Sequence, residues 1–230
     1  MIGNDSFAVA DWAEHRRREG ERYRDGEARL GDASDADARQ RQLTRLGNAA
    51  AGAALASLMR GESADAAEWF ARACVRYRES WEDAPPGSWG RLIAILKARI
   101  LAGDWARAEH DARWSLEQRP DEAESPIGRY AATLAFLVLG EYARGRALAD
   151  ELRTQEAFPT DVGDALAAIT APDPLAYVEA IESVLESFEQ RDAYLEDIPA
   201  ADTVMVLQAL AVRRGLEPAE LESALLPPKS

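Results

Sequence analysis

Three segments share one pattern: LASLMRGESADAAEWFARACVRYRES (residues 55–80), LKARILAGDWARAEHDARWSLEQRP (96–120) and LAFLVLGEYARGRALADELRTQEAFP (134–159). Each has an apolar stretch, then a glycine followed by an acidic residue, then a second stretch rich in small residues. Apolar side chains that recur at helical spacing on both sides of a glycine are typical of a helical hairpin. The pattern therefore predicts hairpins stacked in an α-solenoid or a compact α-array.

The three copies align on Gly61, Gly103 and Gly140. Glycine adopts the left-handed backbone conformation without a Cβ clash, so it can end the first helix of each hairpin. The acidic residue after it is then expected to cap the positive end of the second helix. The second helices carry mostly small residues at helical spacing, which allow close approach of two helix axes: Ala66, Phe70 and Ala73; Ala108, Ala112 and Ser115; Gly145, Ala149 and Leu152.

The second copy resembles the latter half of a tetratricopeptide repeat through Gly103, Asp104, Trp105, Ala108 and Pro120. The aligned glycines lie 42 and 37 residues apart, whereas that repeat has a period of about 34. We therefore expect tetratricopeptide-like packing rather than a regular array. Any antiparallel helical protein with short turns can produce such matches, and this alternative stays open.

The rest of the chain also has helical rather than strand periodicity, so the fold class expected is all-α. Two proline-rich stretches interrupt it, EDAPPGSWG at 82–90 and TAPDP at 170–174. We expect one domain over residues 1–230, with an N-terminal helix in 1–30, hairpins in 36–159 and acidic helices in 160–230. The helices expected span residues 5–25, 36–60, 63–81, 88–102, 104–119, 127–139, 143–156, 160–169, one from 173 onward, and 200–214, followed by a short helix or coil.

The composition suits a globular protein, with 47% hydrophobic and 30% charged residues in a chain of 230. The net charge of −14 repels nucleic acid and anionic membranes and attracts basic partners. The longest apolar runs, at 131–139 and 203–212, are too short to span a bilayer. Residues 1–15 lack the pattern of a secretory leader, and Cys74 is the only cysteine. A cytoplasmic location is therefore expected.

No catalytic, cofactor-binding or metal-binding signature occurs in the sequence. His15 and His110 lie on different expected helices, and His110 is expected to be partly exposed beside a carboxylate neighbour, Glu109 or Asp111. Cys74 falls within an apolar stripe and is expected to be an inert, packed thiol. The acids at 32, 35 and 37 lack the glycine and the closing glutamate of a calcium loop, so they are interpreted as helix-start residues. We expect no enzymatic activity, no cofactor and no metal.

One basic cluster, HRRREGERYR at residues 15–24, lies on the first expected helix. The favoured interpretation is a solvated helix face on which Glu14, Glu19 and Glu21 pair with the arginines. A nucleic-acid contact is the alternative, and the overall negative charge speaks against it.

The whole acidic excess lies after Gly61, because residues 1–60 hold ten acids and ten bases. Residues 173–202 alone carry nine acids and one base, Arg191. The acids recur at steps of three and four, which places them in a ridge along one helix beside its apolar face. A solvated face of an acidic protein is one interpretation, and a surface for a basic protein is the other. The candidate partner-binding residues are Glu179, Glu182, Glu186, Glu189, Asp192, Glu196 and Asp197.

The segment LQALAVRRGLEPAELESALLPP, residues 207–228, resembles the end of the immunity protein 49 family. The matching features are an apolar helix, then Arg214-Gly215, Glu222-Ser223, Leu226 and Pro227, which together cover about a tenth of the chain. The resemblance implies a mainly helical bacterial protein that neutralises a toxin of a polymorphic toxin system. It carries over no binding residue.

Three hypotheses follow. The favoured one is a non-enzymatic immunity protein that binds a protein partner, a basic toxin, without contacting nucleic acid or membrane. The second is a tetratricopeptide-like scaffold or adaptor that holds a peptide in a polar groove. The third is an enzyme or ligand-binding helical domain, which would need a polar pocket that the sequence does not supply. The oligomeric state and the choice between an open solenoid and a closed bundle stay open.

Overall fold

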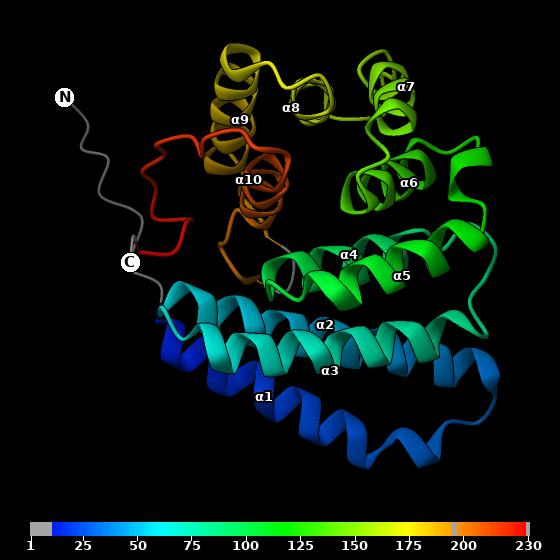
Figure 1. Cartoon of the computed structure of the whole chain (residues 1–230). Coiled ribbons are helices and arrows are strands. Elements are labelled where there is room, and N and C mark those ends of the chain that lie inside the picture. Colours follow the sequence, from blue (N-terminus) through cyan, green and yellow to red (C-terminus); the bar gives the residue numbers. More distant parts are fainter. Residues whose placement is uncertain (1–10, 195–196, 229–230) are drawn as a thin grey trace.

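The computed structural model describes residues 11–194 and 197–228, and within these ranges the chain is helical and contains no strand (Figure 1). The all-α prediction is confirmed. The helices are α1 (Trp12–Ala28), α2 (Ala36–Met59), α3 (Ser63–Trp81), α4 (Gly90–Leu101), α5 (Trp105–Glu117), α6 (Pro126–Leu139), α7 (Tyr142–Leu152), α8 (Thr160–Thr170), α9 (Pro174–Glu189) and α10 (Asp202–Arg214), with short 3₁₀ helices at Leu30–Asp32 and Pro120–Glu122.

The helices form a stack of antiparallel hairpins, because each one from α1 to α9 packs against the next. Figure 1 shows the stack rising from α1–α3 through α4 and α5 to α6–α9. The first helices of two successive hairpins, α4 and α6, also touch each other. Contacts of this kind are expected when hairpins stack in register, as in helical repeat proteins.

The three aligned glycines have the predicted left-handed backbone, with φ of 76° at Gly61, 66° at Gly103 and 74° at Gly140. The capping prediction holds for only one acid. The Asp104 carboxylate accepts a hydrogen bond from the Arg107 backbone N–H at 3.2 Å.

The two glutamates that follow the other glycines do not cap the next helix through their side chains. Their side chains are one methylene longer than aspartate, and they reach arginines instead. Glu62 pairs with Arg60 at 2.7 Å, and Glu141 pairs with Arg144 at 2.9 Å.

The small residues of the second helices are buried at the helix contacts, as predicted. Ala66, Ala108 and Ala112 have no exposed surface, and Gly145 and Ala149 are buried too. The apolar stripe of α3 is likewise buried, except that Trp81 is half-buried at its end. The hairpins therefore meet through the faces that the sequence pattern indicated.

Helix α4 separates two apolar cores. Ile95 and Ala98 belong to the core shared with α1, α2 and α3, whereas Leu96 and Ile100 belong to the larger core shared with the later helices. Apolar side chains on two sides of one helix join the two halves of the stack. This is the position that a helix with a wide apolar surface is expected to occupy.

Helix α10 returns across the stack and packs against α4, α8 and α9 (Figure 1). Its Val204, Leu207 and Leu210 are each at most 2% exposed. At its start, the Asp202 carboxylate pairs with Lys97 of α4 at 2.6 Å. The stack is therefore closed on this side by its own chain, as in a closed bundle and not as in an open solenoid.

Several expected boundaries differ from the structure. The Asp11 carboxylate caps α1, which extends three residues beyond the expected end at 25 and leaves a shorter linker before α2. The residues expected to begin this helix lie outside the described ranges. Asp35 caps α2, as the interpretation of a helix-start acid requires. Helix α7 ends at Leu152 rather than 156. The segment after α10, expected as a short helix or coil, is coil.

A polar contact joins the first three helices. The Asp65 carboxylate of α3 accepts hydrogen bonds at 2.6 Å from Arg16 Nε of α1 and from Ser57 Oγ of α2. The Arg16 guanidinium is the main cause of a pKa of Asp65 lowered to about 2, with the Ser57 hydroxyl contributing in the same direction. The charged form of Asp65 therefore stabilises the α1–α2–α3 packing.

The depressed pKa predicts a loss of stability in acid. The contribution of Asp65 is fully present above its unfolded pKa of about 4 and disappears as the pH falls towards 2. We expect Asp65→Asn to lower the free energy of unfolding at neutral pH by about 1 to 2 kcal/mol, discounted because the Asp65 side chain is 36% exposed. Urea unfolding at a series of pH values measures this. An unchanged pH dependence in the variant would contradict the assignment.

The left-handed turn at Gly103 gives a second prediction. A Cβ built at Gly103 meets no atom within 4 Å, so Gly103→Ala adds only backbone strain, which we expect to cost about 1 kcal/mol. The matched control is Gly90→Ala, where the Cβ is equally unobstructed but φ is not positive, and stability should hold or rise slightly. Urea midpoints compare the two variants, and equal losses would contradict the explanation.

Candidate interaction surface

The acidic ridge lies along the outer face of α9. The Asp173 carboxylate caps this helix by accepting from the Ala176 N–H at 3.1 Å, and Pro174 occupies its first turn. Tyr177, Ile181 and Val184 are buried on the inner face. Four predicted residues share the opposite face and are all exposed: Glu179, Glu182, Glu186 and Glu189.

The predicted extension of the ridge divides into three parts. Asp192 is exposed just after the end of α9. Glu196 lies outside the described residues. Asp197 is exposed with a left-handed φ of 55°, and its charge acts on His15 of α1. The structure therefore keeps the ridge on α9 and turns Asp197 towards the N-terminal helix.

The ridge carboxylates differ from most other acids in having no compensating cation. Within the described residues, Glu179, Glu182 and Glu186 form no ion pair, and Glu189 accepts a hydrogen bond from Ser223 Oγ at 2.7 Å. The nearest arginine in the sequence, Arg191, places its guanidinium over the Phe188 ring at 3.5 Å. The negative charge of this face is thus left open to an external partner.

An exposed leucine continues the same stripe. Leu175 is 79% exposed and lies one and two turns before Glu179 and Glu182. Val178, at the side of the stripe, is 37% exposed. Sequence reasoning missed Leu175, although its position outside the inward series of α9 was a usable signal. These two side chains offer apolar contact area beside the charged stripe.

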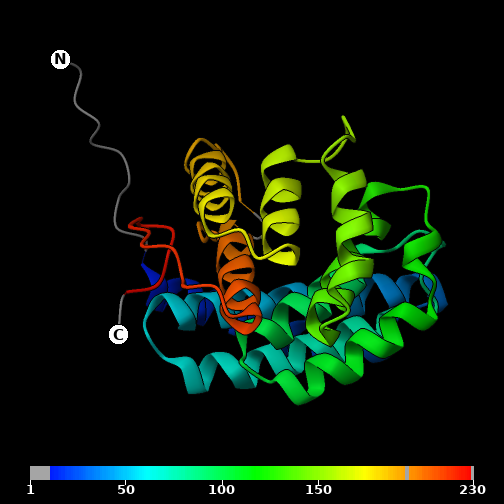
Figure 2. The same cartoon turned by 45° about the horizontal axis from the view of Figure 1, so that its top comes forward.

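A cleft of about 570 Å³ opens beside the ridge, between α7, α8 and α9. Figure 2 shows these three helices standing side by side. It is lined by Arg146 of α7 and by Arg153, which directly follows α7, by Asp161 and Asp164 of α8, and by Glu179 of α9. The sequence did not predict the cleft, because its walls come from three helices that meet only in the folded chain.

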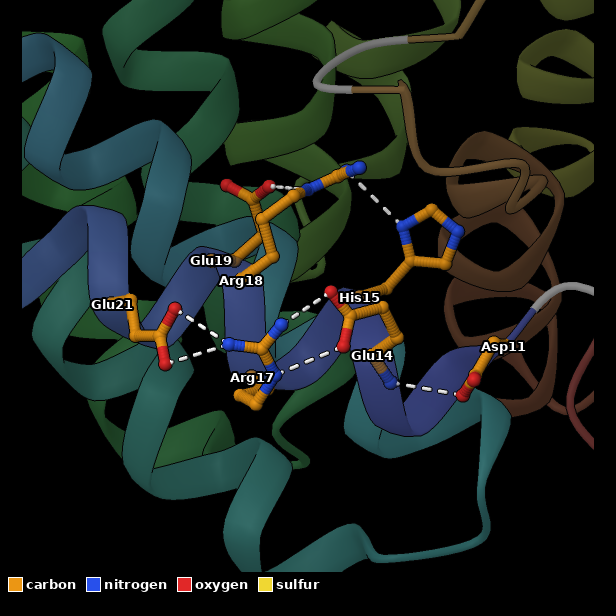
Figure 3. A network of polar contacts seen from close by, with 7 residues as sticks. All are labelled: Asp11, Glu14, His15, Arg17, Arg18, Glu19 and Glu21. Atoms are coloured by element: carbon orange, nitrogen blue, oxygen red, sulfur yellow. Dashed lines mark hydrogen bonds and ion pairs between the residues drawn. The ribbon is translucent and has the colours of Figure 1, made fainter.

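Three arginines of the basic cluster, Arg17, Arg18 and Arg22, pair with acids of α1 itself, and Figure 3 shows the contacts of the first two. Arg17 pairs with Glu14 at 2.6 Å and with Glu21 at 2.8 Å. Arg18 and Arg22 both pair with Glu19, whose side chain is fully buried. The interpretation of the cluster as a helix face with local partners agrees with these contacts, although the burial of Glu19 was not foreseen.

The histidines form no common site. Burial, followed by the charge of Arg18, lowers the pKa of His15. His110 is exposed on α5, but the expected neighbour Asp111 is buried and accepts from Arg78 and Arg99, each at 2.8 Å. Asp111 therefore serves the packing of α3, α4 and α5 and not His110. In the parts of the chain that the structure describes, no group of His, Cys, Asp and Glu is arranged to hold a metal ion.

No protein-family model matches the chain, and no curated protein or solved structure matches it. None of the described helices is both long and apolar enough to cross a membrane.

Residues 207–228, which resemble the end of the immunity protein 49 family, end α10 and form the C-terminal coil. Gly215 ends α10 with φ of 92°, and Arg214 places its guanidinium over the Tyr142 ring at 3.9 Å. After this turn, Leu221 and Leu225 are buried, and Ser223 reaches Glu189 of the ridge. The segment therefore closes the stack and attaches the C-terminal coil beside α9.

The environment of Cys74 predicts an unreactive thiol. Its side chain is 2% exposed, and burial raises its pKa to about 12. Because the thiolate is the reactive form, we expect an aromatic disulfide reagent at mildly alkaline pH to label the native protein only as fast as it unfolds. Labelling is followed by absorbance, with protein in guanidinium chloride as the control for full reaction. Immediate labelling of the native protein would contradict the packing of α3.

Proposed function

We propose that this chain is an immunity protein that neutralises a basic toxin by stoichiometric binding in the cytoplasm. The observation that carries the proposal is the outer face of α9, where exposed carboxylates without ion pairs stand in line with the exposed Leu175. An apolar side chain next to a charged stripe supplies both contact area and charge complementarity. The resemblance of residues 207–228 to the immunity protein 49 family agrees with this role.

The ridge supports fast capture of a toxin. Charges of one sign on one face raise the association rate constant with an oppositely charged protein. At low salt it reaches about 10⁸–10⁹ M⁻¹s⁻¹, compared with about 10⁵–10⁶ M⁻¹s⁻¹ without electrostatic steering. The chain as a whole, with a net charge of −14, adds to the attraction. Such binding weakens as salt screens the charges.

The adaptor hypothesis has less support. It needs an open groove with polar side chains on the first helices of the hairpins, but α10 packs against α4 and α8 on that side. A peptide would have to displace buried side chains such as Leu207, which has no exposed surface. We therefore place the partner on the outer face of α9 and propose binding, without catalysis, as the mode of action.

The proposal is tested by using the full chain as bait in a lysate of its own cell at low and high salt. We expect capture of one basic protein encoded beside this chain, more strongly at low salt. Co-expression of the two should restore growth that the captured protein alone inhibits. A captured protein that is not toxic, or one whose toxicity persists on co-expression, would refute the immunity role.

A matched pair of variants locates the surface. The combined change Glu179→Gln, Glu182→Gln and Glu186→Gln should lower affinity for the toxin at least about tenfold, because it removes the open carboxylates. The control, Glu82→Gln, Glu117→Gln and Glu124→Gln, alters net charge equally at exposed positions elsewhere and should change affinity about twofold or less. Isothermal titration calorimetry compares them, and equal losses would reject the ridge as the binding surface.

A further inference from the structure

The cleft between α7, α8 and α9 has a small, apolar floor beneath charged walls. Its volume is about 570 Å³, which leaves room for a long side chain together with some of its backbone. No bulky side chain lines the floor, which consists of alanines from two helices and the turn between them: Ala167, Ala168, Ala171, Ala176 and Ala180.

Both arginines of the cleft are already engaged by carboxylates. Arg146 Nε donates to Asp150 Oδ2 at 2.6 Å, and Arg153 Nε donates to Asp164 Oδ1 at 2.5 Å. Arg146 also donates to the backbone oxygen of Ala167 at 3.4 Å. These contacts fix the α7 wall and leave it with little free positive charge, so the cleft is not suited to an anion.

The remaining acids of the cleft differ in what they bind. Asp161 accepts from the Val162 N–H at 2.9 Å, and Asp173 accepts from the Ala176 N–H at 3.1 Å, so both serve their own helices. Glu179 forms no hydrogen bond or ion pair with any described residue. Both of its carboxylate oxygens are therefore available to an incoming cation, whereas the other acids of the cleft already accept at least one hydrogen bond.

We infer that the cleft is the anchor site of the interface and receives one arginine side chain of the basic partner, with its guanidinium on Glu179. This inference rests on the proposed toxin-binding role. The aliphatic stem of an arginine suits the alanine floor, and its planar head matches a carboxylate in two hydrogen bonds. Arginine is favoured over lysine because the guanidinium is more weakly hydrated and forms this paired contact.

The surroundings of the cleft agree with an anchor at this place. The exposed Leu175 lies one turn before Glu179 and offers an apolar contact to the same partner. Glu182 and Glu186 continue beyond Glu179 along the outer face and steer the partner without lining the cleft. Interfaces commonly combine one buried anchor with a charged rim in this way.

Two variants of one helix separate the cleft from general charge attraction. The probe is an acetylated, amidated hexa-arginine peptide, titrated into the full chain at low salt and followed by calorimetry and by amide chemical shifts. We expect Glu179→Gln to weaken binding about tenfold and Glu182→Gln, with the same loss of charge, about twofold or less. The shifts should centre on residues 167–180, and a hexa-lysine peptide should bind more weakly. Equal losses in the two variants, or no binding of hexa-arginine, would overturn the inference.

Filling the cleft distinguishes this inference from the immunity role. Ala171→Trp places a bulky side chain at an exposed position of the cleft, and Ala147→Trp makes the same change on the exposed surface of α7 away from it. We expect only the first to weaken capture of the toxin. A toxin neutralised equally well by both variants would overturn the cleft and leave the immunity role standing. If hexa-arginine binds in the cleft but the chain neutralises no toxin, the cleft stands as an arginine site and the immunity role is refuted.

Discussion

The packing of α10 against α4, α8 and α9 is the contact on which the rest of the structure depends. Its Val204, Leu207 and Leu210 are almost completely buried there. Burying an aliphatic side chain of this size contributes about 1.5–3 kcal/mol of favourable free energy relative to leaving it exposed. Without α10, the apolar sides of α4, α8 and α9 that it covers would face water.

This closure determines which surface is left for a partner. The side of the stack that would hold a peptide in an open repeat array is occupied by α10, and the coil after Gly215 is fastened beside α9 by Leu221 and Leu225. The outer face of α9 stays uncovered. Its glutamates repel one another at three- and four-residue spacing, at a cost of a few tenths of a kcal/mol per pair. A stable helix with a fully buried inner face tolerates that cost.

Within the described residues, arginines pair with carboxylates inside the fold and leave the exposed carboxylates of α9 without an ion pair. In the first three helices, Arg16 joins Asp65 and Ser57. Between α3, α4 and α5, Arg78 and Arg99 hold the buried Asp111. These arginines form ion pairs within the fold, because a buried or half-buried carboxylate needs a partner. On α9 the carboxylates are exposed and solvated, so the fold requires no cation there. The negative charge of that face is free to act on another molecule.

The sequence by itself determined the local features of this protein. The left-handed turns at Gly61, Gly103 and Gly140, the cap at Asp173 and the buried stripes of α3 and α9 follow from backbone preferences and from spacing within one helix. Such short-range physics can be read along the chain. The helices came within a few residues of the expected ranges for the same reason, and the ridge was found because its members share one helix.

Only the tertiary structure decided the remaining features. Glu62 and Glu141 turned to arginines instead of capping, and Asp111 turned away from His110 to Arg78 and Arg99. The cleft combines residues of α7, α8 and α9, and the return of α10 closes the hairpin stack. These outcomes depend on which faces meet across long separations in the chain. That choice is made by the burial of apolar surface in the whole molecule, which no single helix specifies.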